Sequence, residues 1–232
     1  MIITFDGTTS SGKSSIAKEL SKQTKICYVS TGSIYRALTR KCLNLGVAPD
    51  DNEKLKFLLE TTNLEYYQEK DKNVIKVDGL IQSPKELHSP EVSNATPLYA
   101  SKDFVRAYVR GIQKFLAKQN TDIIVEGRDI GSVVFPDADF KFFVDADLQT
   151  RAERRFLDYV EQDKVVPLSQ VIKDIEERDN QDREREHSPL VMTQDAIFID
   201  TTNLTLQESV DKIRKIIDEK TISKWKTKKS SK

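Results

Sequence analysis

Short apolar runs alternate along the chain with longer stretches in which apolar residues recur every three or four positions. The short runs have the length of buried strands, and the longer stretches, such as residues 15–20, have the spacing of amphipathic helices. This alternation is typical of a parallel sheet with helices on both faces. The pattern predicts an α/β fold with three α/β/α layers, whose five parallel strands are residues 2–5, 26–29, 123–125, 140–144 and 196–199.

One stretch between the second and third predicted strands has a different character. Residues 64–68 and 74–77 flank a polar turn at residues 69–73. Two strand-like runs on either side of such a turn predict a hairpin. We therefore expect a small antiparallel insertion in the parallel fold.

Directly after the first predicted strand comes the sequence GTTSSGKS, which fits the phosphate-binding loop (P-loop) pattern G-x-x-x-x-G-K-[ST]. The glycines allow backbone N–H groups to surround a phosphate at the positive end of a helix. Lys13 is then expected to reach the β- and γ-phosphates of a nucleotide, and the Ser14 hydroxyl to ligate Mg²⁺. A flexible glycine-serine turn is the alternative, but the flanking strand and helix favour a nucleotide site. The predicted ATP-binding residues are Gly7, Thr8, Thr9, Ser10, Ser11, Gly12, Lys13, Ser14 and Ser15.

Composition narrows the range of partners. The 232 residues, 38% of them hydrophobic, suffice for one good core with an additional lobe. The 37 basic and 37 acidic residues balance, so no overall field favours nucleic acid or an anionic membrane, and a small-molecule substrate is expected. We find no run of membrane-spanning length and no signal peptide, which predicts a cytoplasmic protein. Cys27 and Cys42 lack metal-ligand spacing and are expected to be buried apolar side chains.

The positions of the arginines indicate which class of P-loop protein this chain resembles. An Asn-Lys-x-Asp motif, which guanine-binding GTPases use, is absent from the sequence. Arginines instead follow predicted strands or lie in the charged segment 177–185. Several guanidinium groups are what an enzyme needs to hold a second phosphate and to neutralise a phosphoryl group in transit. Arg128 and Asp129 directly follow the strand at 123–125, where open α/β sheets bind ligands.

Five segments in order resemble the bacterial cytidylate kinase family, a nucleoside monophosphate kinase branch of the P-loop fold. They are residues 31–36, 92–95 leading to 105–106, 127–138, 151–155, and 178–183 leading to 188–190. The segment 127–138 is very specific to the family. The resemblance covers nearly everything except the last dozen residues.

The resemblance implies transfer of the γ-phosphoryl group of ATP to CMP or dCMP. By resemblance, Asp129 accepts from the cytosine amino group and Arg106 donates to N3 and O2. Arg36, Arg128 and Arg185 resemble the clamp on the acceptor phosphate, Arg178 and Asp182 resemble contacts to its sugar, and Arg154 resembles the arginine that approaches the transferring group. The predicted catalytic residues are Lys13, Arg128, Arg154 and Arg185.

Within this scheme, residues 1–30, 100–150 and 175–219 form the core and residues 31–99 the monophosphate-binding insertion. Residues 151–174 are expected to form a helical lid, and residues 220–232 a basic, disordered tail. Arg151, Arg155 and Arg183 are explained equally well as surface ion pairs. His88 and His187 are isolated and receive no role. A monomer is expected.

Several alternatives stay open. Pro97, Ser30 and Gln181 depart from the family pattern, which leaves tolerance of UMP and the choice between ribose and deoxyribose unassigned. Another small P-loop kinase, acting on dTMP, UMP, AMP or a non-nucleotide alcohol, is the nearest competing interpretation. A nucleotide-sensing module without turnover is the competitor from a different class.

Overall fold

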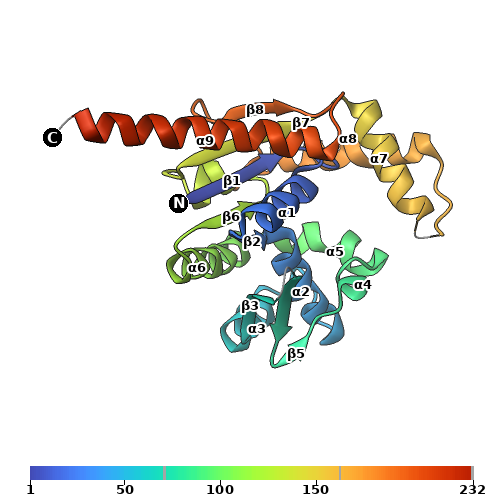
Figure 1. Cartoon of the computed structure of the whole chain (residues 1–232). Coiled ribbons are helices and arrows are strands. Elements are labelled where there is room, and N and C mark those ends of the chain that lie inside the picture. The colour runs from blue at the N-terminus through green and yellow to red at the C-terminus, as the bar shows by residue number, and fades with distance from the viewer. Residues whose placement is uncertain (70–71, 162, 231–232) are drawn as a thin grey trace.

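Five parallel strands form the central sheet, in the order β2-β6-β1-β7-β8 (Figure 1). The computed structural model describes residues 1–69, 72–161 and 163–230. All five predicted strands are confirmed, each with its ends within two residues of the prediction. Their bounds are β1 Ile2–Gly7, β2 Cys27–Ser30, β6 Ile123–Glu126, β7 Phe140–Asp145 and β8 Ile197–Asp200.

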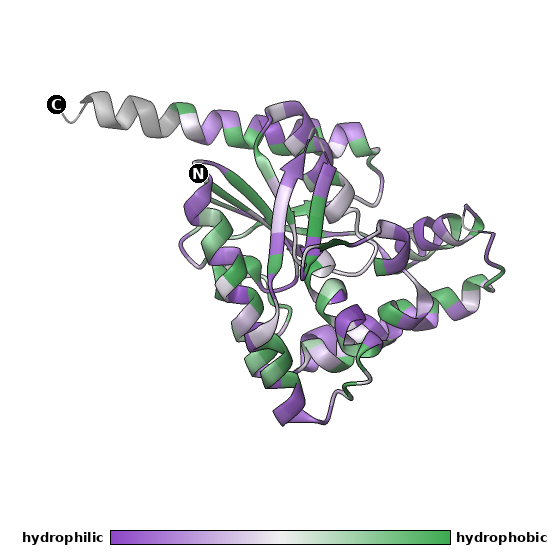
Figure 2. Cartoon of the chain, turned by 90° about the horizontal axis from the view of Figure 1, so that it is seen from below, coloured by the Kyte–Doolittle hydropathy of each residue, from purple (hydrophilic) through white to green (hydrophobic). Residues whose placement is uncertain are grey.

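Side chains of the strands alternate between two apolar layers, because successive residues of a strand point to opposite faces. Ile124 packs with Phe5 beneath helices α1 (Lys13–Thr24) and α9 (Leu206–Ser230). Ile123 and Val125 pack on the other face, beneath α2 (Thr31–Asn44), α6 (Asp103–Gln119) and the short π-helix η1 (Ile130–Val134). Figure 2 shows apolar positions along the central strands. The three-layer arrangement is thus confirmed.

The predicted antiparallel insertion is also confirmed. Strands β3 (Leu64–Glu69) and β4 (Lys72–Val77) pair from Leu64 opposite Val77 onward, and residues 70–71 of the predicted turn lie outside the described residues. A third short strand that the sequence analysis did not predict, β5 (Leu80–Ile81), pairs with β4. Asp78 and Gly79 connect the two with positive φ angles, as a tight Asp-Gly hairpin turn requires. Helices α3 (Asn52–Thr61), α4 (Pro84–Leu87) and α5 (Pro90–Ala100) complete this part.

Helices α7 (Leu148–Val160) and α8 (Leu168–Glu184) form a helical hairpin that extends to one side of the sheet (Figure 1). They share an apolar cluster of Ala152, Val171 and Ile175, separate from the two layers at the sheet. The hairpin therefore has packing of its own, which is what a segment needs if it moves as a unit.

The C-terminal segment differs from the prediction of a disordered tail. Helix α9 continues to Ser230, so residues 220–230 are helical, and residues 231–232 lie outside the described part. In Figure 1 this end of α9 extends beyond the sheet. Composition alone suggested a tail, but an amphipathic helix already begins at Leu206 and its lysine-rich end carries no glycine or proline to stop it. No helix in the described ranges has the length and apolar character to cross a membrane.

Candidate active site

The phosphate loop joins β1 to α1 at the carboxyl edge of the sheet. Gly7 has φ 149°, and a Cβ there would lie 1.9 Å from the Val144 carbonyl oxygen, so this position admits only glycine. Gly12 has φ 88°. Within the loop the Thr8 carbonyl accepts from the Ser11 hydroxyl at 3.0 Å and from Lys13 Nζ at 2.9 Å. The nine predicted ATP-binding residues are thus contiguous around one turn that ends at a helix N-terminus.

Lys13 lies in an environment that disfavours its charge. Its side chain is buried, and burial together with the Arg128 guanidinium lowers the pKa of its ammonium to about 7, although the Glu126 and Asp182 carboxylates oppose this. An anion placed beside Lys13 would restore the charge. The loop therefore holds a buried lysine whose charge a bound phosphate would stabilise.

Ser14 faces a carboxylate that the sequence analysis did not single out. Its hydroxyl donates to Glu126 Oε2 at 3.0 Å, while Ser30 donates to Glu126 Oε1 at 2.8 Å. Glu126 ends strand β6 and is buried. Its position directly before Gly127 and Arg128, at the carboxyl end of a predicted strand, was the signal available in the sequence.

A second group of charged side chains contains arginines and aspartates from distant parts of the chain, which pair with one another. Arg106, on α6, donates to Asp129 Oδ2 at 2.6 Å. Asp182, on α8, is buried and accepts from Arg128 Nε at 2.8 Å, while Arg185 Nη1 and Arg178 Nε lie 3.4 Å from its two oxygens. Arg185 Nη2 also lies 3.7 Å from Asp129 Oδ1 and joins the two groups. The structure thus brings together six of the seven predicted acceptor-site residues in one hydrogen-bonded and ion-paired cluster.

The seventh, Arg36, projects from α2. Burial lowers the pKa of its guanidinium to about 10. The Glu126 carboxylate opposes this lowering, and the Arg178 and Arg128 cations add to it. Gly32 makes room for it, since a Cβ at that position would lie 2.9 Å from Arg36 Nη1. Three buried guanidinium nitrogens have no hydrogen-bond partner among the described residues: Arg36 Nε, Arg106 Nε and Arg185 Nη2.

Asp6, which the sequence analysis missed, connects the phosphate loop to the segment that follows Asp129. Its carboxylate accepts from the backbone N–H groups of Ile130 at 2.8 Å and Gly131 at 2.7 Å. Burial raises the pKa of this carboxyl to about 6, against the lowering effect of these two hydrogen bonds. Because Asp6 precedes the phosphate loop and its partners follow Asp129, this contact sets where Arg128 and Asp129 stand relative to the loop.

The three arginines of α7 lie in different environments, and one of them, Arg151, is not at the surface as the sequence analysis allowed. Arg154 donates to the Thr201 carbonyl at 2.7 Å, and Thr201 in turn donates to the Ser11 carbonyl at 2.9 Å, so Arg154 lies beside the phosphate loop. Arg151 is buried and is no surface residue. It binds Asp179 of α8 and donates to the Thr9 carbonyl at 3.1 Å.

Arg155 and Arg183 fit the interpretation as surface residues. Arg155 is partly exposed, lies over the ring of Tyr159 and pairs with Asp158 at 3.7 Å. Arg183 is exposed. Spacing along α7 could not separate the buried Arg151 from its neighbours, because that depends on where α8 packs.

A family model described as cytidylate kinase matches residues 3–219. The chain belongs to the cytidylate kinase family. It is 39% identical over 226 residues to a cytidylate kinase of Clostridium tetani, covering 97% of each chain, and 38% identical over 215 residues to one of Clostridium botulinum, covering 93% of this chain and 96% of that one. The family resemblance seen in the sequence is thereby confirmed.

Solved structures share the fold at much lower identity. An uncharacterized protein from Eubacterium ventriosum aligns with a TM-score of 0.52 and 15% identity, over 94% of this chain and 98% of its own. At that identity the likeness supports the α/β architecture alone. The cytidylate kinase assignment rests on the family model and on the clostridial relatives.

Proposed function

We propose that this protein transfers the γ-phosphoryl group of ATP to CMP or dCMP, giving ADP and CDP or dCDP. The observation that carries the proposal is the set of buried N–H groups on Arg36, Arg106 and Arg185 that make no hydrogen bond to the described residues, although Arg185 Nη2 lies 3.7 Å from Asp129 Oδ1 as an ion pair. A buried donor without a partner costs free energy, and folded proteins rarely keep one without a reason. Three of them around Arg128 fit a ligand that brings an anionic phosphate and a base with acceptor atoms.

The Arg106–Asp129 pair suits cytosine. The base offers an amino donor beside ring and carbonyl acceptors, which complement a carboxylate and a guanidinium. Uracil would instead place a carbonyl against Asp129, leaving two acceptors facing each other. Both side chains are buried, so the mismatch could not be relieved by water at low cost.

A magnesium ion fits the donor chemistry of Ser14 and Glu126. A hydroxyl and a carboxylate are hard oxygen donors, and Mg²⁺ typically uses one or two such groups together with phosphate oxygens and water. When bound, the ion would offset the negative charge that develops on the phosphates during transfer. We assign Ser14 as its direct ligand from the protein, with Glu126 as the carboxylate behind it.

Transfer then depends on positioning and electrostatics, without a covalent intermediate. Lys13 would hold the donor phosphates, and Arg128 and Arg185 the acceptor phosphate. Arg178 and Asp182 would contact the sugar, and Arg154 would supply positive charge from α7. The α7–α8 hairpin, which contacts the loop through Arg151 and Asp179, would act as the lid that excludes water.

The decisive experiment measures ADP formation from ATP and Mg²⁺ with CMP, dCMP, UMP, dTMP and AMP as acceptors. We expect kcat/KM for CMP or dCMP to exceed that for the other monophosphates by about a hundredfold or more, because a mismatched hydrogen-bonding site rejects strongly. A preference for another monophosphate would overturn the cytosine assignment. Binding of ATP with no turnover of any acceptor would instead indicate a nucleotide sensor.

A further inference from the structure

Glu126 is held by two hydroxyls, one from each side of the site. Ser14 of the phosphate loop donates to Oε2, and Ser30 at the end of β2 donates to Oε1 at 2.8 Å. Ser30 itself accepts from the Ser33 hydroxyl at 3.1 Å. The carboxylate therefore has both oxygens occupied and little freedom to rotate.

Tyr66 extends this chain of hydrogen bonds into the insertion. Its hydroxyl accepts from the Ser30 N–H at 2.9 Å and lies 3.4 Å from the Tyr28 carbonyl, to which it donates. Both main-chain groups belong to β2, the terminal strand of the sheet, whose outer edge pairs with no other strand in the described part of the chain. Tyr66 is buried and comes from β3, so one phenol hydroxyl occupies the place that a paired strand would take.

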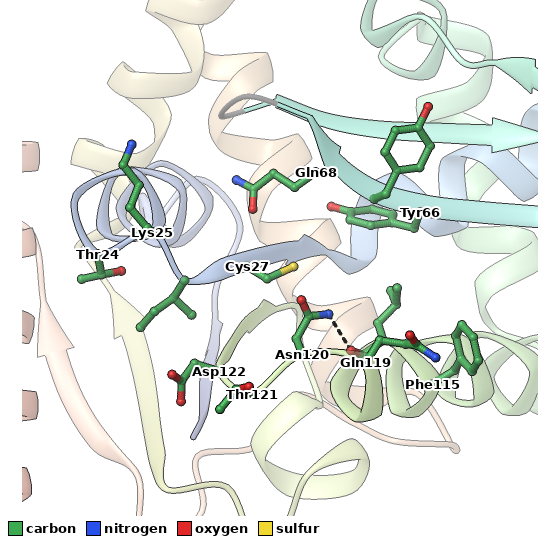
Figure 3. A pocket seen from close by; sticks show the side chains of 13 residues that line it. Thr24, Lys25, Cys27, Tyr66, Gln68, Phe115, Gln119, Asn120, Thr121 and Asp122 are labelled. Carbon is green, nitrogen blue, oxygen red and sulfur yellow. Dashed lines mark hydrogen bonds between the residues drawn. The ribbon is translucent and has the colours of Figure 1, made fainter.

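Figure 3 shows Tyr66 reaching from the insertion toward β2, on the side of Cys27. The ring forms one wall of a groove of about 710 Å³ that is lined also by Phe115 and Asn120 of the α6 end. The groove lies at the amino-terminal half of β2, whereas Ser30 lies at its carboxyl end beside Glu126. The Tyr66 hydroxyl thus links the insertion to the backbone of Ser30, whose own hydroxyl donates to Glu126.

We propose that Ser30 and Tyr66 are positioning residues that set the affinity of the Ser14–Glu126 pair for a divalent cation. Ser30 orients the carboxylate, and Tyr66 fixes the backbone from which the Ser30 hydroxyl projects. Groups that hydrogen-bond a metal-site carboxylate hold it in the orientation the ion needs, and their loss typically weakens binding. The proposal rests on the proposed function, because the cation is the one that accompanies ATP. It makes the acceptor-binding insertion a determinant of metal affinity.

The test removes single hydroxyls and measures Mn²⁺ binding, not turnover. Ser30→Ala and Tyr66→Phe are compared with wild type, with Ser30→Thr as the rescue and Tyr67→Phe as the matched control. Tyr67 is the next residue of β3, points away from the network and lies under Lys76 at the surface. Mn²⁺ is titrated into the complex with a non-hydrolysable ATP analogue and the free ion is read by electron paramagnetic resonance.

We expect Mn²⁺ to bind up to about tenfold more weakly to Ser30→Ala, the lower end of the range for partners of metal ligands, because Ser30 acts on the ligand Ser14 through Glu126. Tyr66→Phe should show a smaller loss in the same direction, and Ser30→Thr and Tyr67→Phe should match wild type. Unchanged Mn²⁺ affinity in Ser30→Ala, with only the melting temperature lowered, would overturn the proposal. So would an increase in KM for CMP without any change in Mn²⁺ affinity.

The two hypotheses fail in different ways. If wild type does not phosphorylate CMP but Mn²⁺ binding still weakens in Ser30→Ala, the proposed function is wrong and the positioning role stands. If Tyr66→Phe does not fold, the comparison of Ser30→Ala with Ser30→Thr decides the matter, because both keep the backbone contact to Tyr66.

Discussion

Arg106 Nη2 lies 2.6 Å from Asp129 Oδ2, and the two side chains are only 3% and 6% exposed. A buried ion pair that loses one partner leaves a charge without compensation, so this pair can be tested by a change that keeps its shape. The guanidinium also lies over the Tyr35 ring, at 5.7 Å from its centroid. The two groups proposed to recognise the base are therefore buried in the protein interior.

Asp129→Asn should lower kcat/KM for CMP by about a hundredfold or more, because the amide presents a donor to the cytosine amino group. It should also reduce the free energy of unfolding by about 3 kcal/mol, since Arg106 stays buried without its counter-ion. Steady-state kinetics, urea unfolding and an ATP-binding titration measure the three quantities. ATP affinity should stay within about twofold. Asp137→Asn, at an exposed turn, is the control. Full CMP turnover in Asp129→Asn would exclude the proposed readout.

Lys13→Met should abolish transfer while leaving the protein as stable as wild type, or more stable, at pH 6. The folded-state pKa of Lys13 is lowered to about 7 from 10.5, so the unfolded chain binds more protons between those values. Stability of wild type should accordingly rise with pH across that window, by at most about 5 kcal/mol. The methionine variant should lack this rise. Urea unfolding at several pH values checks it, and parallel curves for the two proteins would contradict the buried, neutralised lysine.

ATP binding should be accompanied by proton uptake near pH 8, because the phosphates raise the pKa of Lys13 from its value of about 7 in the free protein. Wild type should take up about one proton per ATP, and Lys13→Arg, which keeps its charge at every accessible pH, should take up almost none. Calorimetry in two buffers of different ionisation enthalpy measures the difference. Equal uptake by both proteins would assign the proton to another group.

Asp179→Asn should loosen the α7–α8 hairpin from the phosphate loop. Asp179 accepts from the Thr9 N–H at 2.9 Å and pairs with the buried Arg151, so both helices are held at one loop residue. We expect faster hydrogen exchange in α7 and α8, and more ATP hydrolysis in the absence of acceptor relative to transfer, because water enters an open site. Asp174→Asn, on the exposed side of α8, should behave as wild type. Unchanged exchange in Asp179→Asn would show that other contacts hold the hairpin.

Asp6→Asn should weaken the link between the phosphate loop and the acceptor site. The amide keeps one oxygen for Ile130 or Gly131 and turns its NH₂ toward the other N–H, which leaves a buried donor unpaired. The expected cost is about 1–3 kcal/mol of unfolding free energy. KM for CMP should rise more than KM for ATP, because the displaced residues adjoin Asp129. A larger effect on ATP would place the role of Asp6 in the loop alone.

Elements with local signals were predictable. The five strands follow from short apolar runs, and the phosphate loop from glycines that its backbone angles require. The family resemblance picked out Arg106 and Asp129, which the structure pairs although they lie 23 residues apart. The short strand β5 was missed although its Asp78-Gly79 turn is a local signal, because a strand of two residues has no periodicity to detect.

The local pattern of the chain was enough to specify the layers and the P-loop, because hydrophobic period and turn chemistry depend on neighbours in sequence. The residues expected to bind the acceptor came from the family resemblance. Long-range packing was needed to assign Glu126 to the Ser14 hydroxyl, Asp6 to the Ile130 and Gly131 amides, and Arg151 to the interior instead of the surface. A carboxylate or guanidinium looks the same in sequence whether solvated or buried. Its role follows from the desolvation and the partners that only the folded chain supplies.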